Sequence, residues 1–391
     1  MTRITGSYLS VTAGGEEVRA FVPALLPVAD PPVVIEGSLA RRMTAADAAI
    51  RHLELAAQMV PSIDWFLYGF VRKEAVVSSQ IEGTQATLTD LLEFEAREDE
   101  KPTPDVEEVC NYVEALKYAR AQTASAKGLP LSVRLLNEVH KRLMRGVRGA
   151  ARAPGQIRKT QNWIGGSRPG NAAFVPPPPE QLPELLANLE KYLHGNETLP
   201  PLVRAGIVHV QFETIHPYLD GNGRIGRLLI ALMLEHWKVL PFPLLYLSLF
   251  FRRHQAEYYR RLSRVRSDGD WEGWLDFFLD GVATIGEEAV RLARDLFALV
   301  SADRVRVLEE SGTSVAALRL FEALPAQPIV TVNSVIRLLE TTKPTAAKAI
   351  DTLVGADVLK ETTGKLRGRE FAYQAYLGRL ASDAAIKPAR D

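Results

Sequence analysis

The segment His216-Pro217-Tyr218-Leu219-Asp220-Gly221-Asn222-Gly223-Arg224-Ile225-Gly226-Arg227 carries more information about this chain's fold than any other. It lies between two stretches with helical apolar periodicity, residues 202–214 and 224–237. The second stretch is almost wholly apolar, which is typical of a helix that is buried on all sides. The pattern therefore predicts two core helices joined by a polar, glycine-rich loop.

The glycines and arginines of this segment predict a site for a polyphosphate. Gly221 and Gly223 permit positive φ angles, so successive backbone N–H groups can converge on an anion. The start of the following helix adds further N–H groups and a partial positive charge. Arg224 and Arg227 are three residues apart and share a helix face, and two guanidinium groups beside such a nest suit phosphates.

Two other side chains of the segment point to catalysis. The Asp220 carboxylate lies next to the nest, where it can hold Mg2+ together with phosphate oxygens. His216 stands at the loop entrance and can take a proton from an attacking hydroxyl. A plain helix–loop–helix corner explains each residue singly but not their combination. The run Gly221–Gly226 also fits G-x-G-x-x-G, but a helical segment precedes it where a dinucleotide site needs a strand.

The segment resembles the signature of Fic-domain proteins, H-P-F-x-D/E-G-N-G-R-x-x-R, and differs at its fixed positions only in Tyr218. The resemblance covers residues 40 to 300 and implies a mainly α fold whose activity is transfer of AMP from ATP to a hydroxyl side chain of a protein. It implies that His216 is the general base and Asp220 the Mg2+ ligand. The resemblance also implies that the phosphates are bound by Gly221, Asn222, Gly223, Arg224 and Arg227, with Arg227 binding the γ-phosphate.

A second motif, Ser78-Ser79-Gln80-Ile81-Glu82-Gly83, lies at the end of a predicted helix over 65–81. Ser78 and Glu82 are four residues apart and share a helix face. Alone, Glu82 would be a solvated carboxylate near a helix end. Beside the Fic signature, the run Ser78, Glu82, Gly83 resembles the family's inhibitory motif S/T-x-x-x-E-G/N in its N-terminal class. The resemblance implies that Glu82 pairs with Arg227 and blocks the γ-phosphate.

The region 145–180 is rich in glycine and proline, and within it two short apolar arms flank a turn-rich tip. This pattern predicts a small β-hairpin, followed by four prolines that hold the chain extended. It fits the family's flap, on which an extended target segment would dock by strand addition, although an ordinary surface hairpin has the same pattern. The candidate docking residues are Trp163, Ile164, Gly165, Phe174 and Val175.

Two adjacent tyrosines follow the core helices, Tyr258 and Tyr259. The resemblance implies that an aromatic residue here packs on the adenine, and we favour Tyr259. Simple core packing, with one tyrosine inside and one outside, is the alternative.

The C-terminal region, residues 313–378, resembles a winged helix-turn-helix domain: three helical segments precede a β-like tail. Residues 301–312 are expected to be a linker or a helix end. Basic residues would lie on the recognition helix and in the wing, among them Lys348 and Arg367, so DNA binding is one possible role. Protein docking or dimerisation is another, because fold does not choose function.

Composition narrows the classes of protein. The chain has 391 residues, 47 Lys plus Arg against 47 Asp plus Glu, and one cysteine, Cys110. Zero net charge argues against a polycationic nucleic-acid coat or a membrane-surface binder. A single cysteine excludes an internal disulfide, and no apolar run is long enough for a bilayer, so we expect a cytoplasmic protein. The expected domains are 1–105 with the inhibitory helix, 106–300 as the Fic core, and 313–378.

Two functions remain open at this point. One is a protein adenylyltransferase that is autoinhibited by Glu82, acts on an unknown target protein or on itself, and forms a homodimer as relatives often do. The other is a DNA-binding regulator whose Fic core senses a nucleotide. An intact His216 favours the enzyme, because a sensor does not need a base. Another nucleotide donor, such as UTP, and removal of AMP as a second activity also stay open.

Overall fold

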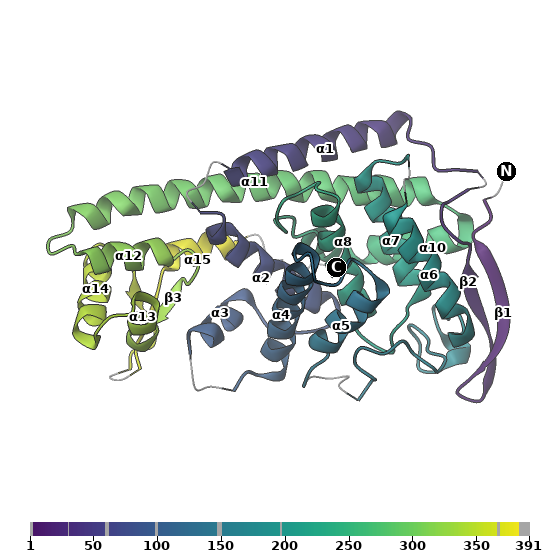
Figure 1. Cartoon of the computed structure of the whole chain (residues 1–391), viewed down its shortest axis with the longest axis horizontal. Helices are drawn as coiled ribbons and strands as arrows, with labels where there is room; N and C mark the ends of the chain where they lie inside the picture. Colours follow the sequence, from purple (N-terminus) through teal and green to yellow (C-terminus); the bar gives the residue numbers. More distant parts are fainter. Residues whose placement is uncertain are drawn as a thin grey trace.

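The structure is a computed structural model, and it describes residues 3–29, 31–58, 62–97, 101–146, 151–195, 198–365 and 368–382. Over these residues the protein is mainly helical, as predicted, with two small antiparallel sheets (Figure 1). No helix in the described ranges combines the length and the apolar character needed to cross a bilayer. The elements not introduced below are α6 (Leu182–His194), α9 (Ser248–Arg253) and the short 3-10 helix η2 (Pro179–Gln181).

The N-terminal region forms a regular β-hairpin. Strand β1 (Gly6–Ala13) pairs with β2 (Glu16–Pro23) along their whole length. The turn between them uses Gly14 and Gly15, both with positive φ (55° and 84°), which a two-residue turn with the twist of a hairpin requires. The hairpin lies at one end of the long axis of the molecule (Figure 1).

Two long helices run side by side along the molecule, α1 (Gly37–Gln58) and α11 (Trp271–Glu309) (Figure 1). Of the two expectations for residues 301–312, a linker or a helix end, the helix end is correct, because α11 continues unbroken to Glu309. The reason is packing: Val307 is fully buried, and the buried Asp303 carboxylate accepts a hydrogen bond of 2.6 Å from the Tyr373 hydroxyl. The last turns of α11 thus belong to the core of the C-terminal unit.

The central helices carry the site. They are α2 (Asp64–Ile81), α3 (Leu88–Ala96), α4 (Pro104–Ala124), α5 (Val133–Leu143), α7 (Pro201–Ile215), α8 (Asn222–His236) and α10 (Gln255–Asp268). Helices α7 and α8 pack against each other and are almost entirely buried, as their apolar sequences predict. A capping box starts α3, with Thr87 and Asp90 each accepting the other's backbone N–H. These contacts place the 216–221 loop between two rigid helices.

The C-terminal unit contains α12 (Val315–Ala323), α13 (Val332–Leu339) and α14 (Lys343–Gly355), with strands β3 (Ile329–Thr331), β4 (Lys360–Glu361) and β5 (Glu370–Ala372) in the order β3-β5-β4. The predicted β-like tail was partly wrong, since residues 374–381 form a further helix, α15 (Gln374–Ala381). The winged-helix assignment and DNA binding stay predictions. Lys348 lies on α14, whereas Arg367 lies outside the described residues.

The C-terminal unit packs against α2 and against the segment that follows α3. The Tyr376 hydroxyl donates to the Trp65 carbonyl at the start of α2 (3.1 Å), and Arg97 after α3 pairs with Glu370 of β5 (2.7 Å). Buried residues of this unit and of the central helices form one continuous hydrophobic core.

Candidate active site

A cavity of about 410 Å³ lies between the end of α2, the α7–α8 loop, α10 and the flap region. Among the predicted site residues, it is lined by Glu82, Ile164, Phe174, His216, Gly223, Arg227 and Tyr259. Its other lining residues are Ala173, Glu213, Tyr258, Leu262, Ser263 and Arg266. The tertiary structure therefore joins the signature loop, the inhibitory motif and the flap in one cavity, although they lie far apart in the sequence.

Two left-handed residues shape the signature loop. His216 ends α7 with φ 50° and ψ 61°, and Gly221 precedes α8 with φ 76° and ψ 5°. The Asn222 side chain closes the loop, because its Oδ1 accepts from the Tyr218 N–H and its Nδ2 donates to the Tyr218 carbonyl, both at 2.8 Å. Asn222 thus uses its side chain to hold the loop, and only its backbone N–H stays available to a phosphate.

The His216 imidazole is suited to accept a proton. Burial, followed by the positive charge of Arg158, lowers its pKa to about 4. The side chain is therefore uncharged at neutral pH, which is the form that a general base needs. Within the described ranges its Nδ1 atom is buried and has no hydrogen-bond partner.

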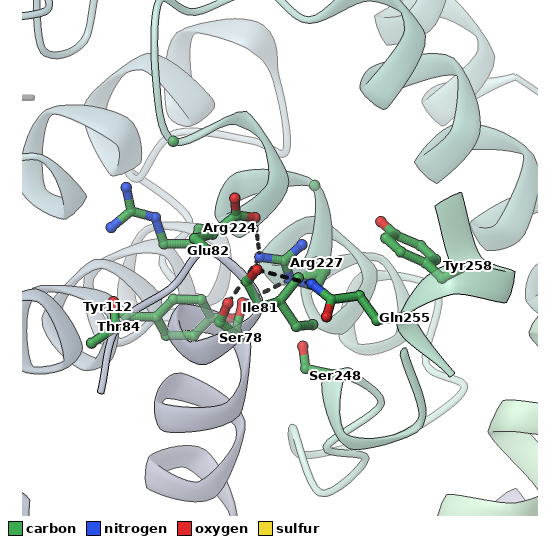
Figure 2. Close-up of polar contacts among 12 residues, drawn as sticks. Ser78, Ile81, Glu82, Thr84, Tyr112, Arg224, Arg227, Ser248, Gln255 and Tyr258 are labelled. Carbon is green, nitrogen blue, oxygen red and sulfur yellow. Dashed lines mark hydrogen bonds and ion pairs between the residues drawn. The ribbon is translucent and has the colours of Figure 1, made fainter. Parts of the chain in front are cut away.

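The predicted pair of Glu82 and Arg227 is present (Figure 2). Arg227 donates from Nη2 to Glu82 Oε1 (2.6 Å) and to the Ser78 carbonyl (2.9 Å), and from Nε to Ser78 Oγ (2.9 Å). A Cβ atom at Gly223 would lie 2.2 Å from Glu82 Oε1, so the carboxylate lies directly against the backbone of the first turn of α8. Glu82 therefore occupies space at the α8 end of the cavity.

The charge state of Glu82 follows from two opposing effects. Burial alone would raise the pKa of its carboxyl, but the charge and hydrogen bond of Arg227 outweigh it and hold the pKa below its ordinary value. The Glu82 side chain keeps 35% of its surface exposed, while that of Arg227 keeps 2%. Gly83 follows with φ 99°, a conformation that ends α2 and turns the chain away.

The other signature arginine does not line the cavity. Arg224 Nη1 lies 2.5 Å from Glu108 Oε1 on α4, and these two side chains are 4% and 8% exposed. Arg224 Nη2 contacts the Met144 sulfur at 3.6 Å. Figure 2 shows the Arg224 and Arg227 guanidinium groups pointing in different directions. We missed Glu108 in the sequence because one acidic residue in a helix carries no signal of burial.

Asp220 lies beside the nest, and its side chain keeps 46% of its surface exposed. Its Oδ1 accepts from the Gly221 N–H at 2.6 Å. Its carbonyl is held at 3.0 Å by His140 Nε2, which carries the ring proton because Nδ1 accepts from the Gly155 N–H. In the part of the chain that the structure describes, no three potential metal ligands gather. One exposed carboxylate fits Mg2+ as a ligand shared with substrate phosphates.

Two charged residues that line the cavity have no counterpart in the sequence motifs. The Glu213 carboxyl is buried, which raises its pKa to about 7. Its Oε1 has no hydrogen-bond partner among the described residues, and Gly226 leaves room for it, since a Cβ there would lie 2.3 Å away. Arg266 of α10 stacks over the Phe174 ring at 3.9 Å. The only feature of the sequence that could have pointed to Glu213 is its position one helical turn before His216.

The two adjacent tyrosines divide as one inside and one outside. The Tyr258 ring is buried and its hydroxyl bonds to His209 Nε2 at 2.8 Å, whereas Tyr259 is 46% exposed. Both line the cavity, and the exposed ring of Tyr259 is the freer of the two to pack against a ligand.

The flap is less regular than predicted. The two predicted arms pair antiparallel, but only through one bridge between Ile164 and Phe174, and a 3-10 helix, η1 (Pro169–Asn171), forms the tip. The N-terminal hairpin also binds the flap, since the Phe21 N–H of β2 donates to the Val175 carbonyl at 2.9 Å. Trp163, Gly165 and Val175 do not line the cavity, and Trp163 is 37% exposed.

The comparisons with known proteins agree with this geometry. Residues 40–121 match the Fic/DOC family N-terminal profile, and residues 130–234 match the Fic/DOC family profile. A probable protein adenylyltransferase of Aquifex aeolicus is 29% identical over 178 residues, which are 44% of this chain and 51% of that protein. Protein adenylyltransferase Fic of Drosophila erecta is 27% identical over 205 residues, 51% of this chain and 38% of that protein.

The chain thus spans about half the length, or less, of the curated relatives it matches. Among solved structures, a Fic family protein from Desulfovibrio desulfuricans G20 has a TM-score of 0.56 at 24% identity, covering 88% of this chain and 98% of that one. That likeness shows the fold over nearly the whole chain, including the mainly helical architecture that the sequence predicted.

Proposed function

This chain belongs to the Fic/DOC family, and we propose that it is a protein adenylyltransferase that transfers AMP from ATP to a hydroxyl side chain of a protein. The observation that carries the proposal is one cavity in which an uncharged His216 faces the glycine nest and Arg227. A base beside a polyphosphate site is what phosphoryl-group chemistry on a hydroxyl requires. The names of the relatives support the same reaction.

The reaction joins a target hydroxyl oxygen to the α-phosphorus of ATP. That O–P bond forms as the bond from the α-phosphorus to the oxygen bridging to the β-phosphate breaks, and pyrophosphate leaves. His216 takes the hydroxyl proton, and AMP remains on the target as a phosphodiester. The nest at Gly223 and the Arg227 guanidinium stabilise the charge that develops on the leaving group. Asp220 would hold Mg2+, and the ion would neutralise part of the negative charge of the phosphates.

Glu82 restrains this reaction in the proposed enzyme. Its carboxylate pairs with Arg227 and lies against Gly223, where a phosphate of bound ATP would have to sit. A phosphate and the carboxylate cannot share this space or this guanidinium. Removing the carboxylate therefore frees both the nest and Arg227.

The test is AMP labelling with α-labelled ATP and Mg2+ in three proteins: wild type, Glu82→Gly, and Glu82→Gly with His216→Ala. We expect label on the protein or on lysate targets with Glu82→Gly, little with wild type, and none without His216. ATP binding is measured in parallel, so that loss of chemistry is separated from loss of binding. Absence of label from all three proteins, with ATP bound and targets supplied, would contradict the proposal.

A further inference from the structure

Arg158 lies just before the flap, and its side chain is directed entirely at backbone carbonyls. It is 2% exposed, and no carboxylate among the described residues forms an ion pair with it. Its Nε donates to the His216 carbonyl (2.9 Å) and its Nη2 to the Ile215 carbonyl (3.5 Å), while its backbone N–H donates to the Pro217 carbonyl (2.9 Å). One residue thus binds three consecutive carbonyls around the proposed base.

These contacts fall where the backbone is strained. His216 has φ 50° and ψ 61°, and a residue other than glycine keeps that conformation only where its surroundings fix it. A planar guanidinium with several donors in a fixed fork can fix such a segment, while a single flexible ammonium cannot. Arg158 is the side chain that supplies this fixation to the carbonyls of Ile215 and His216.

The same guanidinium also reaches the flap. Nη1 donates to the Thr160 carbonyl (3.3 Å), which precedes the flap, and Nη2 donates to the Pro177 carbonyl, which follows it. The Arg158 guanidinium therefore binds both ends of the flap as well as the carbonyl of His216. We propose that Arg158 is a positioning residue for AMP transfer, which sets the place of the His216 imidazole and its separation from the flap. This inference rests on the proposed function.

The charged groups around His216 make its pKa a second measurement that can test the proposal. The charges of Arg158 and Arg266 lower the His216 pKa, the charge of Glu82 raises it, and a hydrogen bond with the Glu213 backbone also raises it. After burial, the charge of Arg158 is the next cause that lowers the His216 pKa. Loss of that charge is expected to raise the pKa, whereas a lysine at position 158 retains the charge but not the fork.

The experiment uses Glu82→Gly as the parent and adds Arg158→Lys or Arg158→Met. For Arg158→Lys we expect kcat to fall by about 10-fold to 100-fold, with the KM for ATP nearly unchanged and the His216 pKa near that of the parent. For Arg158→Met we expect at least the same loss of kcat and a raised His216 pKa, so that the acid limb of the kcat profile moves to higher pH.

Arg204 provides a matched control. It is 8% exposed, and its Nη2 donates to the carbonyls of Tyr192, Leu193 and Gly195. It therefore has the same kind of contacts as Arg158, but at the far end of α7 from His216. We expect Arg204→Lys to change thermal stability without changing kcat per folded protein or the His216 pKa.

Two results would overturn the proposal. One is an Arg158→Lys kcat equal to that of the parent, and the other is an equal loss of kcat in Arg204→Lys. If the parent transfers no AMP at all, the proposed function fails, and NMR titration of the 13C-labelled His216 ring then decides the positioning role. A pKa that is unchanged in Arg158→Met would overturn it, and a raised pKa would support it. If Arg158→Met does not fold, the kcat and KM of Arg158→Lys decide.

Discussion

The C-terminal end of α2 and α4 each supply one glutamate to one signature arginine, and the two ion pairs have different surroundings. Glu82 keeps 35% of its side chain exposed and lines the cavity with Arg227. Glu108 keeps 8%, is packed behind α8 with Arg224, and does not line the cavity. A partly solvated pair beside an open cavity can exchange its carboxylate for a phosphate. A buried pair cannot separate without leaving a charge in the interior. We therefore interpret Glu82 as a regulatory group and Glu108 as a structural one.

The largest expected effect is on stability, at the buried pair. Glu108→Ala leaves the Arg224 guanidinium buried without its carboxylate, and we expect it to lower the free energy of unfolding by about 3–5 kcal/mol. Glu82→Ala also takes the carboxylate from a buried arginine, but Arg227 keeps the Ser78 hydroxyl and carbonyl as acceptors beside an open cavity, so we expect a smaller loss than for Glu108→Ala. Urea unfolding of both variants checks this difference. Equal losses would end the distinction between the two pairs.

The next effect is on activity, at the exposed pair. Glu82→Gln keeps the size of the side chain but removes the charge that competes with a phosphate for Arg227. We expect the initial rate of AMP transfer to rise by about 5- to 150-fold, the usual range of a coupling between two ligands. Glu108→Gln, measured per folded protein, should bring no rise. A comparable rise with Glu108→Gln would mean that both glutamates are inhibitory.

A smaller effect is expected at Ser78, which accepts from Arg227 Nε through its hydroxyl. Ser78→Ala removes one acceptor of the inhibited state, and a single hydrogen bond of about 1 kcal/mol corresponds to a roughly fivefold rise in rate. Ser79 is the control, because its buried hydroxyl has no hydrogen-bond partner in the described ranges. Ser79→Ala should leave the rate of AMP transfer as it was. Equal rates in the two variants would remove Ser78 from the inhibitory contact.

The smallest expected effect is that of pH on inhibition. Burial would raise the Glu82 pKa, but Arg227 holds it below its ordinary value, so the carboxylate stays charged through the neutral range. A depressed pKa means that the ion pair is lost only as the pH falls through that lowered value. We therefore expect the ratio of Glu82→Gln to wild-type rates to change by less than about twofold between pH 6 and 8. A ratio that approaches one near pH 6 would show that Glu82 is protonated there.

Most helices were predicted from local patterns, and the errors share one physical cause. The Thr87 capping box and the buried α8 follow from short-range hydrogen bonding and apolar periodicity, so they could be predicted. The last turns of α11 could not, because they are stabilised by the distant Tyr373 hydroxyl on Asp303. The two arms of the flap pair as predicted, but the pairing is limited to one bridge, and this could not be predicted because a distant strand binds the flap. Its Val175 pairs with β2, which lies more than a hundred residues earlier in the chain.

The site divides in the same way. His216, Asp220 and the glycine nest could be assigned from the spacing of the signature segment, since neighbours in a loop and helix start share one local geometry. Only the tertiary structure shows that Arg227 faces the cavity while Arg224 faces Glu108, and that Arg158 holds the carbonyl of His216. Burial and pairing of charges depend on which distant segments pack together. Spacing along the chain determines which groups are available, and long-range packing determines which of them meet and in what charge state.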